Sequence, residues 1–341
     1  MLQFLSSLFV SSEKPSSVVD DALIAAATDR IVEATDKRLF AYGNYRKQLR
    51  DSVETAVVYI INMIDALPLP VEISRRTFSS DPGLHAFFAS FTHLQEKVGG
   101  ARSVREYMKQ AHCEEPARLY GLLTMEWGKI NRLGTVLQGD MIQREVMQKA
   151  VNFFNHRYLG PSDSLEEAKT NMKKRVFDYM IEIALGKIIA ERIMRAELNQ
   201  QQVLLKRKLA MMKAGNWGLG EMLSQNESSY PDLNSLSAEI ESIETELSKL
   251  GASHELLKRN MQIIKDTMSN PGKQMAAHNI NMRLDNMNIK VDESSSVTVN
   301  NLDLIEFYSS RGDTRIVLPC WYPVNELPPM KDFITEAKRY L

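Results

Sequence analysis

The densest cluster of side chains able to ligate a metal is His112, Cys113, Glu114 and Glu115. Zinc in proteins takes histidine, cysteine and carboxylate ligands, usually four in a tetrahedron. Adjacent residues on a loop seldom converge on one ion, so a site here would need His156 or another distant residue to complete it. We therefore predict no metal site and no cofactor.

Other patterns with chemical potential are equally incomplete. His85 and His93 lie eight residues apart on one predicted helix, about 12 Å along its axis, which is too far to share a metal ion. The sequence has no G-x-S-x-G or H-E-x-x-H motif, no paired-cysteine motif and no kinase or P-loop signature. A non-enzymatic protein is favoured. The alternative is an active site of scattered residues near His112–Glu115 and His156, between a helical domain and a sheet.

The composition is that of an ordinary globular protein. The residues are 44% apolar and 25% charged, and the length of 341 residues is enough for two domains and a sizeable core. The 42 basic and 43 acidic residues give a formal charge of -1, so there is no global field to attract nucleic acid or an anionic membrane, and any such binding must be local. Cys113 and Cys320 are the only cysteines, which fits a reducing compartment and predicts a cytoplasmic location.

Residues 1–16 form an apolar start, "MLQFLSSLFV", followed by a short polar tether. No Lys or Arg precedes the apolar run, so it is a poor signal peptide, and its ten residues would cross only about half of a bilayer's hydrocarbon core. We expect no membrane span. The segment either docks on a protein surface or lies at a membrane interface as a weak peripheral anchor.

Residues 17–110 are predicted to form a helical domain. Apolar spacing and capping residues indicate helices from Ser17 to near Gly43, from Leu49 to Leu67, and from Asp81 to Val98, where Pro82 occupies the first turn. A short fourth helix is signalled by the capping pair Ser103 and Glu106.

Two β-rich segments follow, separated by a long helical stretch. Residues 111–163 predict an antiparallel meander with strands at 120–127 and 145–154, although part of the second run also fits a helical turn. Residues 271–341 predict a second meander, with "SSRGD" as a hairpin loop and a short closing helix from Lys331 to Leu341. The simplest arrangement is one sheet assembled from both segments.

Residues 164–270, between these segments, carry the clearest periodicity in the chain. From Leu236 to Met268 apolar residues keep one four-three register for ten positions, through Gly251, which lowers helix propensity by about 1 kcal/mol. We predict a long antiparallel coiled-coil hairpin, inserted between the β segments, with its tip at 214–234. The fold class is therefore α+β and predominantly α: an N-terminal helical domain, an antiparallel β-meander body and this hairpin.

The charges of the hairpin support this pairing. Three basic residues of its first helix are expected opposite four glutamates of its second: Lys206, Arg207 and Lys208 against Glu239, Glu241, Glu244 and Glu246. Exposed pairs contribute about 0.2 to 1 kcal/mol each, so they mainly set direction and register. A phosphate site is disfavoured, because the glycines of "GNWGLGE" lack the Gly-Lys-Ser/Thr of a Walker loop and follow a helix.

The function predicted from these features is that of an interaction or scaffold protein, which binds a partner or a second copy through the hairpin. Large apolar residues at the tip, Trp217, Leu219 and Met222, are candidate partner contacts, unless the tip closes over its own aromatic. The alternative to an enzyme or a scaffold is nucleic-acid association through the basic stretch 169–175, in which "KKR" at 173–175 has no obvious acidic partner. Nucleic acid is disfavoured overall.

Overall fold

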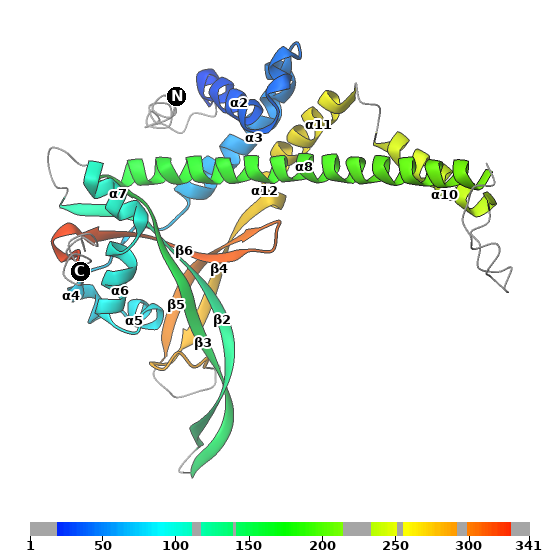
Figure 1. The fold of residues 1–341 in the computed structure, drawn as a ribbon. Helices are drawn as coiled ribbons and strands as arrows, with labels where there is room; N and C mark the ends of the chain where they lie inside the picture. The colour runs from blue at the N-terminus through cyan, green and yellow to red at the C-terminus, as the bar shows by residue number, and fades with distance from the viewer. Residues whose placement is uncertain are drawn as a thin grey trace, which may run out of the picture. The chain divides into compact units, whose positions relative to one another are not determined.

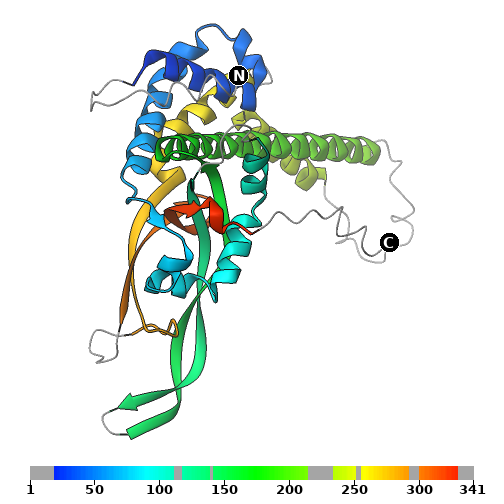
Figure 2. The same ribbon diagram turned by 90° about the vertical axis from the view of Figure 1, so that its left-hand side faces the viewer.

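The computed structural model describes residues 19–110, 117–138, 141–213, 233–250, 255–291 and 299–328. The chain is a mixed helix and strand protein, and the described residues include more helix than strand, so the α+β prediction is confirmed. Figure 1 shows the elements with their labels, and Figure 2 shows them turned by 90°.

The chain divides into two compact units. Unit 1 is built from the described parts of 1–23, 55–178 and 270–341, and unit 2 from those of 24–54 and 179–269. The helical segment predicted at 17–110 therefore contributes residues to both units. The segment 1–16, the closing helix predicted at 331–341 and most of the hairpin tip lie outside the described residues.

Unit 1 contains one sheet that joins the two β segments of the sequence. Its strands are β1 Val71–Glu72, β2 Arg118–Gln138, β3 Met141–Ser162, β4 Met275–Leu284, β5 Asn300–Ser309 and β6 Thr314–Pro323. Their order is β3-β2-β6-β5-β4, all antiparallel, while the short β1 pairs with β6 in parallel. The β2–β6 ladder confirms the prediction of one sheet built from both sides, because it runs from Arg118 opposite Pro323 to Met125 opposite Ile316.

The "SSRGD" hairpin is also confirmed. β5 ends at Ser309 and β6 begins at Thr314, and the Ser309 amide donates to the Asp313 carbonyl at 2.9 Å. Gly312 has φ of +87°, a left-handed conformation that glycine adopts without a steric penalty.

Short helices cover one part of this sheet: α4 Arg75–Phe78, α5 Pro82–Phe87, α6 Phe91–Gly99 and α7 Arg102–Gln110. Helices α5, α6 and α7 contact β3, and their apolar side chains share a core with β2 and β6. Asp81 caps α5 as predicted, with Pro82 in the first turn. The helix predicted from Asp81 to Val98 is wrong, because Phe88 is extended and Ser90 caps a new helix, α6, by accepting from the His93 amide at 3.1 Å.

The predicted capping pair of the fourth helix is also wrong. Helix α7 starts at Arg102, so Ser103 lies inside it, and its hydroxyl donates to the Tyr158 carbonyl on β3 at 2.9 Å. Glu106 accepts from Arg102 across one helical turn at 2.6 Å instead of serving a cap.

The helices of unit 2 include the pair predicted as a hairpin. The elements that contribute to it are α2 Asp21–Thr35, the 3-10 helix η1 Lys37–Ala41, α3 Tyr45–Asp65, α8 Leu165–Lys213, α10 Leu233–Lys249 and α11 Leu256–Ser269; the ends of α2, α3 and α8 belong to unit 1. Helix α2 stops at Thr35 instead of near Gly43, because Asp36 is extended and its carboxylate accepts from the Arg38 amide to cap η1.

The second half of the chain's long helical stretch folds back on α8, as predicted. Lys206 on α8 pairs with Glu244 on α10 at 2.7 Å, which are residues predicted to face each other. Further along α8, Glu191 pairs with Arg259 of α11 at 2.8 Å, so the antiparallel alignment continues. The single run predicted from Leu236 to Met268 is divided into α10 and α11, and Gly251 lies outside the described residues. Coiled-coil packing of these helices stays a prediction.

Candidate interaction surface

The residues predicted at the hairpin tip, Trp217, Leu219 and Met222, lie outside the described residues, so their role as partner contacts stays a prediction. The same holds for the cluster His112–Glu115. Within the described part of the chain, no group of three or more His, Cys, Asp or Glu residues could hold a metal ion.

Two histidines that the sequence placed far apart meet in unit 1. The rings of His93 and His156 have centroids 5.8 Å apart, and the Phe88 ring lies 4.5 Å from that of His156. His156 Nε2 and His93 Nδ1 are buried and make no hydrogen bond. Burial, together with the nearby charges of His93 and Lys97, lowers the pKa of His156 to about 4, so the ring is neutral at pH 7 and packs as an aromatic side chain.

A cleft of about 510 Å³ lies beside α5, lined by polar residues of α5 and of the segments that flank β4 and β5. Most of these polar groups hold the surrounding backbone. Asn288 donates to the Ala86 carbonyl at 2.8 Å, and the Asp285 carboxylate accepts from the amides of Met287 and Ile289 at 2.8 Å each. The hydroxyls of Ser79 and Ser80, which also line the cleft, donate to the Arg75 and Thr77 carbonyls, so the described residues of the cleft show no serine paired with His85 as a nucleophile and base.

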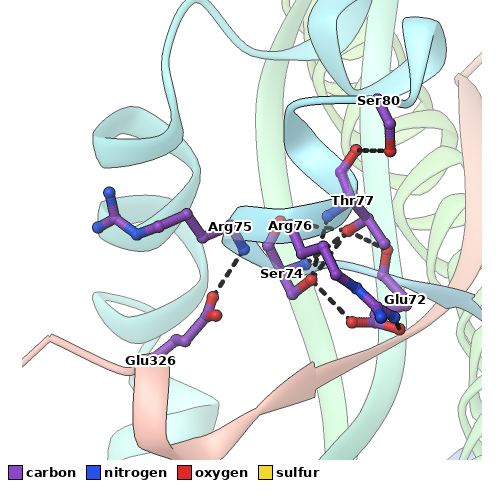
Figure 3. A network of polar contacts seen from close by, with 7 residues as sticks. All are labelled: Glu72, Ser74, Arg75, Arg76, Thr77, Ser80 and Glu326. Atoms are coloured by element: carbon purple, nitrogen blue, oxygen red, sulfur yellow. Dashed lines mark hydrogen bonds and ion pairs between the residues drawn. The ribbon is translucent and has the colours of Figure 1, made fainter.

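Figure 3 shows a polar network around α4 that joins β1 to the segment after β6. Ser74 and Thr77 form a capping box, and the Ser74 hydroxyl also donates to Glu72 at 2.8 Å. The Arg75 amide donates to the Glu326 carboxylate at 2.8 Å, which ties α4 to the chain beyond the sheet. These bonds satisfy the first turn of the helix, so the network is structural.

The nucleic-acid hypothesis requires the cations of the basic stretch 169–175 to be exposed and unpaired, and Lys173 is neither. Lys173 pairs with Asp65 of α3 at 2.9 Å, and only 12% of its side chain is exposed, so the expectation that "KKR" has no acidic partner is wrong. Burial lowers the pKa of Lys174, while Glu167 acts in the opposite direction. These contacts weaken the case for phosphate binding at this stretch.

Helix α8 is held in unit 2 along the side that faces α10, α11 and the loop after α2. The buried carboxylate of Asp36 accepts from Arg192 at 2.9 Å and from Asn260 of α11 at 2.8 Å. Ala184, Ile188 and Leu198 are buried on this side. The helix is therefore anchored on one face.

The other face of α8 presents a row of large apolar side chains to solvent. Five of them are between 44% and 55% exposed, and we call these five the α8 stripe: Ile189, Ile193, Val203, Leu204 and Met211. Together with Ala196, Gln200 and Arg207, they follow one another along the helix at steps close to four and three residues. Side chains at this spacing share one face of a helix, over about 33 Å of its length.

Two apolar four-three series run along this helix, so the sequence contained the signal for the stripe. One of them includes Met194, whose side chain is 48% exposed although that series would place it in the seam between the helices. A second four-three series starting at Ile189 lies alongside the first in the same helix, and periodicity alone does not say which series faces α10.

Comparison with protein-family models, curated proteins and solved structures finds no match to this chain. The described helices also contain none that is both long and apolar enough to cross a bilayer.

Proposed function

We propose that this is a non-enzymatic interaction protein that binds a second copy of itself through the α8 stripe. The observation that carries the proposal is the stripe: an apolar row on a long helix whose other face is already anchored. Exposed apolar surfaces of this extent are characteristic of sites that bind a partner. The pairing we propose is a coiled coil between the two copies of α8, in which Gln200 acts as the polar residue that fixes register.

The expected strength of this contact follows from the burial of the stripe. Complete burial of an aliphatic side chain contributes roughly 1.5 to 3 kcal/mol, so a half-exposed one contributes about 1 kcal/mol when it is covered. Five side chains from each copy then give about 10 kcal/mol, against an association cost of about 4 to 15 kcal/mol. At the lower end of that cost the net free energy is about -6 kcal/mol, so the dimer should form at tens of micromolar and dissociate on dilution.

The charges of α8 favour an antiparallel pair. Residues 199–213 carry four basic residues and no acidic one, whereas residues 178–197 carry four acidic and three basic residues. A parallel pair would place the two basic halves side by side, and an antiparallel pair places each over the mixed half of the other copy. The net charge of -1 adds no general repulsion between copies. We propose a cytoplasmic setting because the chain has only two cysteines.

Sedimentation equilibrium of the full chain over about 1 to 100 μM tests this proposal. We expect wild type to shift from monomer to dimer across the range, and Ile193→Gln with Leu204→Gln to remain monomeric. The matched control is Leu69→Gln with Met287→Gln, which replaces two apolar residues that are 82% and 71% exposed in unit 1. It should dimerise like wild type. A wild-type chain that stays monomeric, or a stripe variant that dimerises as the control does, would contradict the proposal.

A further inference from the structure

The two longest strands of unit 1 continue past the sheet as a two-stranded ribbon. β2 pairs with β6 only as far as Met125, and the outer edge of β3 bonds to the turn after β4 only around Lys149 to Val151. Beyond these points the described residues of β2 and β3 pair only with each other, and the ribbon extends away from the other strands in both views (Figures 1 and 2). We call residues 129–138 and 141–149 the ribbon arm, which is about 30 Å long at 3.4 Å per residue.

The ribbon arm concentrates basic residues for which the described part of the chain offers no acidic partner. It carries four of them, Lys129, Arg132, Arg144 and Lys149, all exposed. Among the described residues no carboxylate forms an ion pair with any of the four, although Lys129 lies 5.7 Å from the centre of the Trp127 ring. The arm contains one acidic residue, Glu145, and Asp140, which falls between its two strands in the sequence, lies outside the described residues.

This arrangement differs from that of the basic residues on the helices. Lys173 and Lys206, for example, are each paired with a carboxylate below 3 Å. The unpaired cations of the arm therefore produce a local positive potential on a chain that is nearly neutral as a whole.

The arm also carries apolar side chains that are unusually exposed. Leu133 and Met147 lie directly opposite each other across the two strands and are 69% and 64% exposed. On the same face, Asn131 lies opposite Lys149, so amide, cation and apolar groups follow one another along the ribbon. A two-stranded ribbon alone in water is marginally stable, and a partner that covers it would stabilise it.

We infer that the ribbon arm binds double-stranded nucleic acid. The major groove of a duplex is about 12 Å wide and admits a two-stranded ribbon, while cations beside it reach the phosphates. Leu133 and Met147 would contact base edges, where the thymine methyl group offers apolar side chains a contact in the major groove. This inference goes beyond the proposed self-association and does not depend on it.

The electrostatic part of the contact has a measurable size. Four cations that each neutralise a phosphate give a slope of log affinity against log salt of about -3.6, because each released counterion contributes about -0.9. The affinity should then fall by roughly a hundredfold between 50 mM and 200 mM salt.

Fluorescence anisotropy with the full chain and a labelled duplex of about 30 base pairs, titrated at several salt concentrations, tests the inference. The arm variant is Arg132→Gln, Arg144→Gln and Lys149→Gln. The control variant removes three exposed cations from unit 2, Lys47→Gln, Lys258→Gln and Lys265→Gln. We expect the control to keep the wild-type slope, and the arm variant to bind roughly tenfold or more weakly at 50 mM salt with a slope near -0.9.

Three outcomes would overturn the inference. The first is no binding of wild type to the duplex at 50 mM salt. The second is a salt slope that changes equally in the arm and control variants. The third is binding to vesicles of phosphatidylserine and phosphatidylcholine without binding to the duplex, which would assign the arm to an anionic membrane surface. Far-UV circular dichroism of each variant verifies that it is folded.

Discussion

Asp36 offers a sharp test of how unit 2 is held together. Its side chain is 5% exposed and accepts hydrogen bonds from three other side chains: Arg38 at 2.7 and 2.9 Å, Arg192 of α8 at 2.9 Å and Asn260 of α11 at 2.8 Å. One carboxylate thus joins the loop after α2 to two other helices. We predict that Asp36→Ala destabilises unit 2 by about 3 kcal/mol.

The magnitude has two parts. The buried amide of Asn260 loses its acceptor, which costs about 1 to 3 kcal/mol. The two guanidinium groups are 58% and 45% exposed, so water replaces the carboxylate and this part is about 1 kcal/mol. The hydrogen bonds from Arg38, with that from Asn260, lower the pKa of Asp36 to about 2 although burial opposes them.

The lowered pKa gives this contribution a pH dependence of known sign. Because the folded-state pKa is below the value of about 3.9 in the unfolded chain, the stabilisation is complete above pH 4 and is lost as the pH falls towards 2. The difference between wild type and Asp36→Asn should therefore shrink over that window. Solvent around the guanidinium groups limits the pH-dependent part to about 1 to 2 kcal/mol.

Urea denaturation followed by circular dichroism measures the loss, and hydrogen exchange locates it. Exchange should accelerate in α2, the middle of α8 and α11, with no change in the sheet of unit 1. The control is Asp29→Ala, since Asp29 also bonds an arginine, Arg46, but its side chain is 36% exposed. Its loss should be at most about 1 kcal/mol. Equal losses for Asp36→Ala and Asp29→Ala would mean that the buried contact with Asn260 contributes no more than an exposed ion pair.

Two further predictions concern unit 1. A Cβ on Gly121 would lie 2.6 Å from the ring of the fully buried Tyr158, so Gly121→Ala should lower the free energy of unfolding, measured by urea denaturation, by about 2 to 3 kcal/mol. The control is Gly43→Ala, which has nothing within 4 Å of the new atom and should change stability by less than about 0.5 kcal/mol. The pKa of His156, about 4 when folded and about 6.5 when unfolded, predicts stability that is complete above pH 6.5 and lost as the pH falls through 4. By pH 5 wild type should have lost about 1 to 2 kcal/mol more than His156→Phe, measured by the urea midpoint at pH 7 and 5.

Each of these predictions has a result that counts against it. A Gly121→Ala chain as stable as Gly43→Ala would mean that the Tyr158 ring can move out of the way. Parallel pH profiles for wild type and His156→Phe would mean that the buried ring titrates as it does in the unfolded chain.

The sequence predicted those features that depend on local patterns. The apposition of Lys206 and Glu244 follows from two charge bands and an apolar period, each readable within one helix. The hairpin between β5 and β6 follows from its turn residues. In both cases neighbouring residues contain most of the information.

Features that depend on distant contacts were missed. The apolar spacing of the third predicted helix continues through Phe88, and the break there coincides with ring contacts to His156 on β3. The role of Asp36 likewise depends on Asn260, which lies far along the chain. The length of β2 was underestimated: the strand predicted at 120–127 ends before Gly128, whereas the pairing with β3 continues past Gly128 and Gly134.

Disulfide trapping tests the proposed antiparallel pair most directly. In a Cys113→Ser background, Gln200→Cys lies at the middle of the α8 stripe and Ile189→Cys at one end. We expect rapid oxidation of Gln200→Cys to a covalent dimer and little from Ile189→Cys, which would face the Met211 end of the other copy. Equal trapping at both positions would show a parallel pair, and trapping at neither would contradict self-association through α8.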